Sequence, residues 1–305
     1  MKRQYFLVIL AIVLLIFTAS CDDDDNDNDT AGTFKGGVAG VDVNFVEEKP
    51  PASFDQGEDV AFKVRLVNNG EYTIPAGEAK AQVYGTSPNF GLTNDYKGTD
   101  NILYGVSKNV DTPGEQEITL GTGSYSEPIV IEQDFPVNAR ICYPYETKVS
   151  TSVCMGSRRI GQSSTDQVCD VQGSRISSGT VSAAPVQVTA IEESYMGSDA
   201  MRFSIDIENK GTGTVYDDAK ACEDLDLVND ANIVYLEIFP EDIKCIFPEG
   251  SEGATGKVTL YGGAKTIVCE RAFEGTSNYN ENLRINLKYK YLDDTSKTVT
   301  VYESS

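Results

Sequence analysis

The sequence contains no histidine and no tryptophan, and 25 Lys and Arg stand against 47 Asp and Glu, for a formal net charge of −22 over 305 residues. Without histidine, the chain has no histidine-based catalytic triad, no histidine metal site and no imidazole proton shuttle. The negative charge also argues against binding to nucleic acid, because phosphate backbones are neutralised by Lys and Arg. We therefore expect no nucleic-acid partner.

Common catalytic motifs are also missing. The chain has no Gly-x-Ser-x-Gly, Ser-x-x-Lys, P-loop or Gly-x-Gly-x-x-Gly pattern, and no Cys-x-x-Cys. These absences remove the usual signatures of nucleophilic, phosphate-binding, dinucleotide-binding and zinc sites. We predict no catalytic residue, no metal site and no cofactor. A pair of carboxylates needs no sequence signature, so an envelope hydrolase that uses paired acids stays as an alternative.

The N-terminus has the pattern of a lipoprotein signal. Lys2-Arg3 precedes an apolar run over residues 5–17, and Thr18-Ala19-Ser20-Cys21 follows. The run has the length of a signal-peptide core and is shorter than the ~20 apolar residues that span a bilayer. Small residues before a cysteine resemble a lipobox, although Thr18 stands where leucine is most common. We predict a signal peptide over residues 1–20 and a lipid on Cys21.

The alternative is an uncleaved anchor, with Cys21 an ordinary thiol. Both interpretations place the rest of the chain outside the cytoplasm, and we expect it at the outer face of the cytoplasmic membrane. Residues 22–29 then carry six carboxylates in eight positions. These charges repel one another, which predicts a solvated acidic tether over residues 21–34. A calcium loop would need spaced ligands and a Gly-enforced turn, which this run lacks. Asn28 begins the one Asn-x-Ser/Thr sequon and is the predicted glycosylation position.

The rest of the chain repeats itself. Residues 41–48 align with residues 186–193, and residues 60–70 align with residues 201–211. The longer segments alternate apolar and polar side chains with period two, and both end in Asn-x-Gly, which favours a turn. A repeat of this length indicates two related domains.

We therefore predict an all-β fold of two tandem immunoglobulin-like antiparallel β-sandwich domains, over residues 35–184 and 185–305. Each domain is expected to end in a hairpin. In the first, residues 140–145 would pair with residues 149–155. In the second, residues 283–292 would turn at residues 293–296 and return.

Six cysteines remain after Cys21, an even number that indicates disulfides outside the cytoplasm. The first hairpin would place Cys142 opposite Cys154, with Cα atoms ~4.5–5.5 Å apart, within reach of a disulfide. Two further pairs are expected. Cys245 and Cys269 flank a Gly-rich stretch, and Cys169 and Cys222 are left by elimination and would join the two domains.

Two other features bear on function. Four of the 16 tyrosines recur at equivalent places in the last strands, namely Tyr143, Tyr145, Tyr289 and Tyr291. Core packing is favoured over a sugar or partner surface, because structural positions repeat in both copies. The segment Gly85–Gly114 is rich in Gly, Asn and Asp, and a loop of this size is expected to be either a binding loop or disordered.

The alternating strand that ends in Asn-Asn-Gly (68–70) or Asn-Lys-Gly (209–211), in tandem behind a lipoprotein signal, resembles CARDB-like immunoglobulin-type domains of archaeal and bacterial surfaces. The segment 142–147 with Cys154 is similar to hairpins of archaeal surface lipoproteins. The resemblance covers residues ~35–305 and implies an extracellular module without catalytic residues.

We therefore expect a membrane-anchored surface lipoprotein that acts as a non-enzymatic adhesion, spacer or protein-binding module of the envelope. Its expected partners are the membrane, through the lipid, and another envelope or surface protein. The alternatives are a lipoprotein that delivers a sugar or peptide to a transporter and the hydrolase named above.

Overall fold

The computed structural model describes residues 33–156, 169–248, 250–275 and 277–304. In this part of the chain the structure is all-β, as predicted, and its helices are two short 3-10 turns, η1 and η2. The strands of the first repeat are β1 (Val41–Phe45), β2 (Ser53–Asp55), β3 (Val60–Asn68), β4 (Lys80–Tyr84), β5 (Lys97–Gly98), β6 (Gly114–Gly123) and β7 (Glu132–Met155), with η1 at Pro88–Phe90. Those of the second are β8 (Val186–Met196), β9 (Ala200–Asn209), β10 (Thr214–Tyr216), β11 (Ile233–Phe239), β12 (Lys244–Ile246), β13 (Glu252–Gly253), β14 (Thr255–Thr259), β15 (Ala264–Ala272) and β16 (Tyr279–Tyr302), with η2 at Cys222–Asp224.

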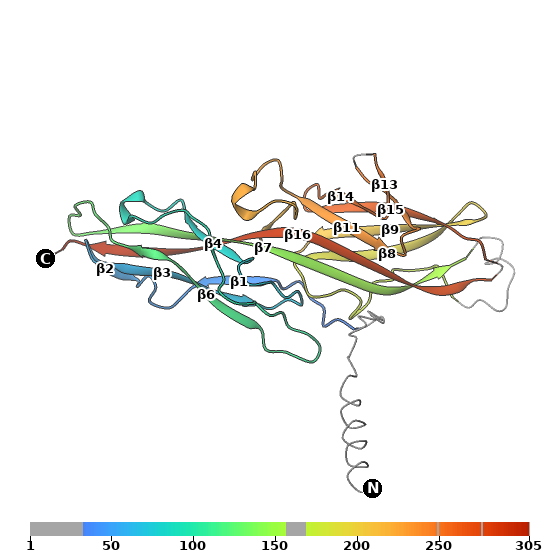
Figure 1. The fold of residues 1–305 in the computed structure, drawn as a ribbon, viewed down its shortest axis with the longest axis horizontal. Coiled ribbons are helices and arrows are strands. Elements are labelled where there is room, and N and C mark those ends of the chain that lie inside the picture. The colour runs from blue at the N-terminus through green and yellow to red at the C-terminus, as the bar shows by residue number, and fades with distance from the viewer. Residues whose placement is uncertain (1–32, 157–168, 249, 276, 305) are drawn as a thin grey trace, which may run out of the picture.

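These strands form three sheets. An eight-stranded sheet has the main order β14-β11-β16-β7-β4-β5, with β10 and β2 also paired to β16. It runs along the whole elongated molecule (Figure 1). A three-stranded sheet, β1-β3-β6, lies at one end of it, and a five-stranded sheet, β13-β12-β15-β9-β8, lies at the other. The all-β sandwich architecture is thereby confirmed.

The two longest strands, β7 and β16, belong to both sandwiches. Each has 24 residues, and they pair antiparallel without interruption from Glu132 opposite Tyr302 to Met155 opposite Tyr279. The start of β7 and the end of β16 lie beside the three-stranded sheet, and their other halves lie beside the five-stranded sheet (Figure 1). Each repeat therefore supplies part of a strand to the sandwich of the other.

The two predicted terminal hairpins are wrong. Residues 147–149 continue β7 opposite residues 285–287, and residues 293–296 continue β16 opposite residues 138–141. The composition of residues 293–296 favours a turn, but a continuous ladder gives every one of these residues a cross-strand partner and overrides that preference. The expected boundary at residues 184 and 185 separates the two unshared sheets but not the two shared strands.

The alternation of the repeated strands does place their apolar side chains inside. On β3 and β9 these are Val60, Phe62, Val64, Leu66, Met201, Phe203, Ile205 and Ile207, all buried. They belong to one core that continues through both sandwiches. Successive side chains of a strand point to opposite faces, so the sequence alone predicted which residues of these strands are buried.

The segment Gly85–Gly114 takes part in the fold, so the disordered alternative is wrong, while its role as a binding loop stays a prediction. It contains η1 and β5. The ring of Phe90 is fully buried, with its centroid 5.3 Å from that of Tyr125 and 5.4 Å from that of Phe135. The aromatic side chain at this position anchors the segment to the core.

The six cysteines form three disulfides: Cys142–Cys222, Cys154–Cys169 and Cys245–Cys269. The predicted Cys245–Cys269 bond is present, between facing positions of β12 and β15. The predicted Cys142–Cys154 bond is wrong, because both residues lie on the one extended strand β7, about 40 Å apart at ~3.4 Å per residue.

The predicted Cys169–Cys222 bond is wrong as well, since Cys222 pairs with Cys142. A disulfide between the two repeats does exist, but it joins β7 to η2. The predicted signal peptide, Cys21, Asn28 and the acidic run all lie outside the described residues. Among the residues that are described, no helix has the length and apolar character to cross a bilayer.

Candidate interaction surface

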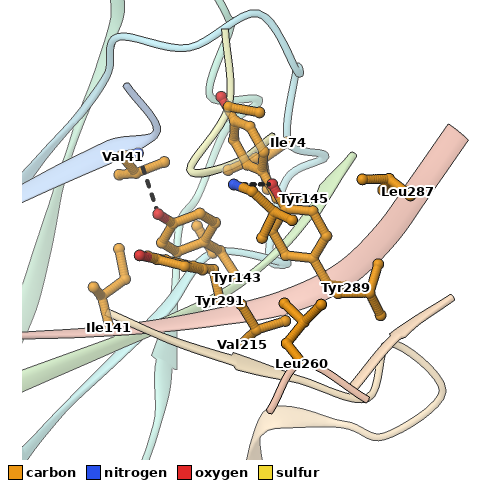
Figure 2. Packing of buried hydrophobic residues seen from close by; sticks show 14 of the residues in the cluster. Val41, Ile74, Ile141, Tyr143, Tyr145, Val215, Leu260, Leu287, Tyr289 and Tyr291 are labelled. Carbon is orange, nitrogen blue, oxygen red and sulfur yellow. Dashed lines mark hydrogen bonds between the residues drawn. The ribbon is translucent and has the colours of Figure 1, made fainter. Parts of the chain in front are cut away.

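The four repeated tyrosines lie in the middle of the β7–β16 ladder, where Tyr143 faces Tyr291 and Tyr145 faces Tyr289. All four are buried, and neighbouring ring centroids are 5.7–6.3 Å apart (Figure 2). The packing interpretation is therefore confirmed. The alternative, a binding surface made from these four rings, is wrong, because no ring is exposed.

Two of the hydroxyl groups hold the first strand of each repeat. The Tyr143 hydroxyl accepts a hydrogen bond from the backbone N–H of Val41 at 3.2 Å (Figure 2). The Tyr289 hydroxyl accepts one from the backbone N–H of Val186 at 3.3 Å. Val41 and Val186 begin β1 and β8, so the same contact recurs in both repeats.

The other two hydroxyl groups bond the asparagines of the Asn-x-Gly turns. Tyr145 donates to Asn68 Oδ1 at 3.1 Å, and Tyr291 donates to Asn209 Oδ1 at 3.3 Å. Each asparagine side chain also donates to a backbone carbonyl four residues further on. The repeated motif therefore closes the end of its strand and binds the tyrosine pair.

The glycines of the same motif are required by close approach. A Cβ at Gly70 would lie 1.9 Å from the Tyr145 hydroxyl, and a Cβ at Gly211 would lie 2.2 Å from the Tyr291 hydroxyl. Only glycine leaves room for the ring. The two repeats are thus related by a pseudo-twofold axis through the facing pair Pro144 and Lys290.

Burial in this cluster disfavours the ionised tyrosine. Desolvation raises the pKa of Tyr143 and of Tyr289 well above the ordinary value, although their hydrogen bonds act in the opposite direction. Desolvation likewise raises the pKa of Tyr145, and it raises the pKa of Tyr291 to about 12. Burial therefore favours the neutral phenol over the ionised form at all four positions.

The described chain begins beside this cluster, where Glu71 holds the N-terminal segment. Its carboxylate accepts hydrogen bonds from the backbone N–H groups of Lys35 (2.9 Å), Gly36 (3.1 Å) and Ala183 (2.7 Å). Residue 183 lies just before β8. One side chain therefore joins the start of the described chain to the connection between the two repeats.

A pocket of about 510 Å³ adjoins this junction. Most of its lining residues are polar or charged, among them Glu146 and Lys148, and two aromatic rings, Phe34 and Tyr72, also line it. Burial raises the pKa of Glu146, and Lys148 and Lys288 partly offset that effect. None of the four clustered tyrosines lines the pocket.

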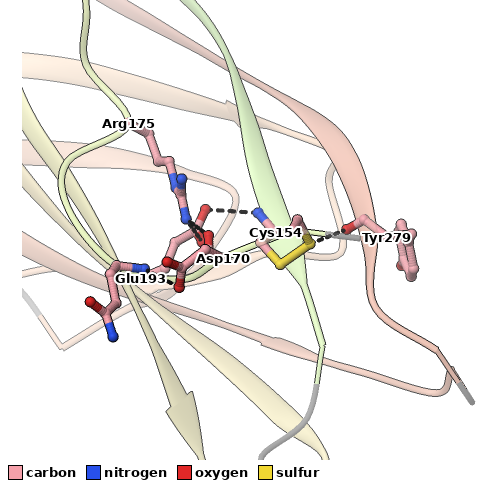
Figure 3. The surroundings of a disulfide bond; sticks show 7 residues. Cys154, Asp170, Arg175, Glu193 and Tyr279 are labelled. Carbon is pink, nitrogen blue, oxygen red and sulfur yellow. Dashed lines mark hydrogen bonds and ion pairs between the residues drawn. A yellow bond between two sulfur atoms is a disulfide. The ribbon is translucent and has the colours of Figure 1, made fainter. Parts of the chain in front are cut away.

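A buried ion pair lies near the far end of the second sandwich. Glu193 accepts a hydrogen bond from the backbone N–H of Cys154 at 2.9 Å and pairs with Arg175 at 2.8 Å (Figure 3). Burial raises the pKa of Glu193, against the effect of Arg175. Because the same β7 residue is bonded to Cys169, the disulfide holds the 169–175 segment against β7 and the ion pair holds it against β8. In the described part of the chain, no group of three or more acidic or cysteine side chains is placed to hold a metal ion.

Sheet edges are the other surfaces that a partner can use. The three-stranded sheet ends at β1 and β6, and β6 has ten residues. Edge strands of this length present unpaired backbone groups to solvent. The sequence predicted β-sandwiches but gave no indication of which strands lie at an edge, because edges depend on the order of strands in space.

No protein-family model and no curated protein matches this chain. Among solved structures, the secreted serine protease VesC from Vibrio cholerae is 11% identical, with a TM-score of 0.20, over 82% of this chain and 51% of that one. Escherichia coli alpha-2-macroglobulin activated by porcine elastase is 10% identical, with a TM-score of 0.16, over 86% of this chain and 32% of that one. The chain thus spans about half of the first protein and a third of the second. At TM-scores this low, neither likeness bears on fold or function.

Proposed function

We propose that this chain is a surface lipoprotein, anchored through a lipid on Cys21, whose two-sandwich body is a non-enzymatic adhesion, spacer or protein-binding module of the cell envelope. The observation that carries the proposal is the β7–β16 ladder. Each of its strands has 24 residues and spans about 80 Å. Because the ladder is uninterrupted, the two sandwiches have no hinge between them.

Two further contacts support a rigid body. The Cys142–Cys222 disulfide ties β7 to the second repeat, and Glu71 ties the N-terminal segment to the connection before β8. Such a body presents its loops and edges at a set spacing, which suits a spacer or a platform for a partner. The described chain begins near the middle of the molecule (Figure 1). Residues 21–32 reach at most about 40 Å when extended, so the body would be held close to the membrane.

The anchor is tested by replacing Cys21. We expect the wild-type chain to enter the detergent phase in a partitioning assay and Cys21→Ala to lose the lipid mass in mass spectrometry. Ser20→Ala is the matched control, since alanine is also small, and it should be processed like the wild type. An unmodified Cys21 in the wild-type chain would contradict the proposal and favour an uncleaved anchor.

Rigidity is tested by spin labels on one exposed residue in each sandwich, Thr122 on β6 and Glu192 on β8. We expect a single narrow distance distribution. A broad one would show motion between the sandwiches and exclude the role as a rigid spacer. Cross-linking in intact cells, followed by mass spectrometry, then tests for a protein partner.

A further inference from the structure

The outer edge of β6 is open in the first sandwich. Lys63 on β3 bonds towards β1, because its carbonyl accepts from Val46 N at 3.0 Å and its N–H donates to Lys49 O at 3.1 Å. Hydrogen-bonding direction alternates along a strand. Val64 and Leu66 therefore bond towards β6.

The same alternation continues on β6 itself. Ile118 and Gln116, which face Val64 and Leu66, bond inward, so the backbone groups of Glu115, Glu117 and Thr119 point outward. No hydrogen bond from another described residue reaches these outward backbone groups. The side chains of these three residues are exposed.

The second sandwich contains the same strand with a neighbour. β15 pairs with β9 as β6 pairs with β3, and the pseudo-twofold relation makes β15 the counterpart of β6. β15 is not an edge, because β12 pairs with its outer side. In that added strand, Cys245 faces the buried Cys269, and Lys244 faces Glu270.

The fold therefore contains its own example of a strand added along this side of the sheet, at residues 268–270, which the registers align with residues 119–122 of β6. The added strand turns one side chain inward and places a lysine opposite a glutamate. β6 has no counterpart of β12 in the described chain. In the second repeat, β12 covers the outer side of β15, whereas the outer side of β6 has no neighbouring strand in the described chain.

The charge of the β6 edge indicates which kind of strand can pair with it. Glu115 and Glu117 lie on the exposed face, beside the positions that an added strand would fill, and Glu117 also pairs with Arg65 of β3 at 3.3 Å. Oppositely charged residues on facing strands attract, and like charges repel. A second copy of this chain, paired edge to edge through β6, would set carboxylates against carboxylates and is therefore disfavoured.

We propose that the outer edge of β6 binds an extended segment of another envelope protein by antiparallel strand addition, and that this segment alternates apolar residues with Lys or Arg. Main-chain hydrogen bonds to Glu115, Glu117 and Thr119 supply affinity, and the two carboxylates supply selectivity. The inference rests on the proposed role as a protein-binding module and names the class of partner.

The test uses the full chain in non-ionic detergent and fluorescein-labelled nine-residue peptides. In one peptide Lys alternates with Val and Thr, and in the control Glu replaces Lys. We expect the Lys peptide to bind at least tenfold more tightly than the Glu peptide. Amide exchange should slow over residues 114–120 when the Lys peptide is added.

Three variants test the location of the site. Thr119→Pro removes an outward N–H without removing a bond to β3, and it should weaken binding at least tenfold. Thr255→Pro changes the same residue type on β14, the edge of another sheet, and should bind like the wild type. Glu115→Lys should reverse the preference between the two peptides. Circular dichroism and thermal melting confirm that each variant is folded.

The proposal is overturned if the Lys peptide does not bind at millimolar concentration, if both peptides bind equally, or if Thr255→Pro weakens binding as much as Thr119→Pro. A cellular partner that cross-links equally to wild type and to Thr119→Pro would overturn the β6 site alone. It would leave the broader role as a protein-binding module standing.

Discussion

Raising the pH above 10 is expected to unfold this protein through the four tyrosines of the β7–β16 ladder. An unfolded tyrosine ionises near pH 10. Burial raises the pKa of Tyr143, Tyr145, Tyr289 and Tyr291 in the folded protein. The unfolded chain therefore holds fewer protons above pH 10, and the stability of the fold falls as the pH rises.

The size of this effect follows from the number of groups. Each buried tyrosine lowers the free energy of unfolding by about 1.4 kcal/mol at pH 11, and the four together lower it by about 6 kcal/mol. Folded proteins are stable by about 5–15 kcal/mol in total. We therefore expect alkaline unfolding with a midpoint between about pH 11 and pH 12.5.

Two spectra recorded on the same samples follow the process. Absorbance at 295 nm reports tyrosinate, and far-ultraviolet circular dichroism reports the β-structure. The absorbance of the four buried rings should rise only together with the loss of β-structure.

Replacing two of the rings tests the cause. Tyr143→Phe with Tyr289→Phe removes two ionisable groups, so the free energy of unfolding should change about half as much between pH 9 and pH 11. Stability at neutral pH should also fall, because two backbone N–H groups lose their acceptors. Tyr104→Phe is the control, since that side chain is 60% exposed. An unchanged pH dependence in the double variant would refute the reasoning.

Three further changes test the junction between the repeats. Replacing both Cys142 and Cys222 by serine should lower the free energy of unfolding by about 4.5 kcal/mol, against about 3 kcal/mol for Cys154 and Cys169, because the first pair closes 80 residues and the second 15. Urea titration measures both, and equal losses would contradict the loop-length account. Gly70→Ala should cost about 2 kcal/mol through contact with Tyr145, whereas Gly253→Ala, whose nearest neighbour would be 3.8 Å away, should leave the melting temperature unchanged. Glu71→Ala should cost about 1–3 kcal/mol and speed amide exchange at Lys35, Gly36 and Ala183, while Glu78→Ala, an exposed change, should do neither.

The local pattern of the sequence predicted the strands well where one face is buried. The alternation in β3 and β9 identified their core positions, and the repetition of the four tyrosines indicated structural sites. The Asn-x-Gly motif was recognised as a turn, but its second role, as the partner of a tyrosine hydroxyl, needed the contact between β3 and the shared ladder.

The pairing of the long strands was not predictable in the same way. Residues 293–296 have the composition of a turn, and only the opposite strand shows that they extend β16. The error propagated, since the predicted Cys142–Cys154 bond depended on a hairpin that does not form. The sequence also did not show that β6 lies at an edge while β15 does not. That difference depends on the pairing of β12 with β15, which is a matter of strand order in space.

The last strand, β16, pairs with β2 near the start of the described chain. Residues 300–302 of β16 pair with residues 53–55 of β2, across a separation of nearly 250 residues. During synthesis, the first half of the polypeptide therefore cannot reach its final form until the last strand has emerged. Contacts this remote slow folding and leave an incomplete sheet exposed in the meantime. We expect that a premature stop codon only ten residues before residue 302 would damage the N-terminal sandwich, although the missing residues belong to the C-terminal repeat.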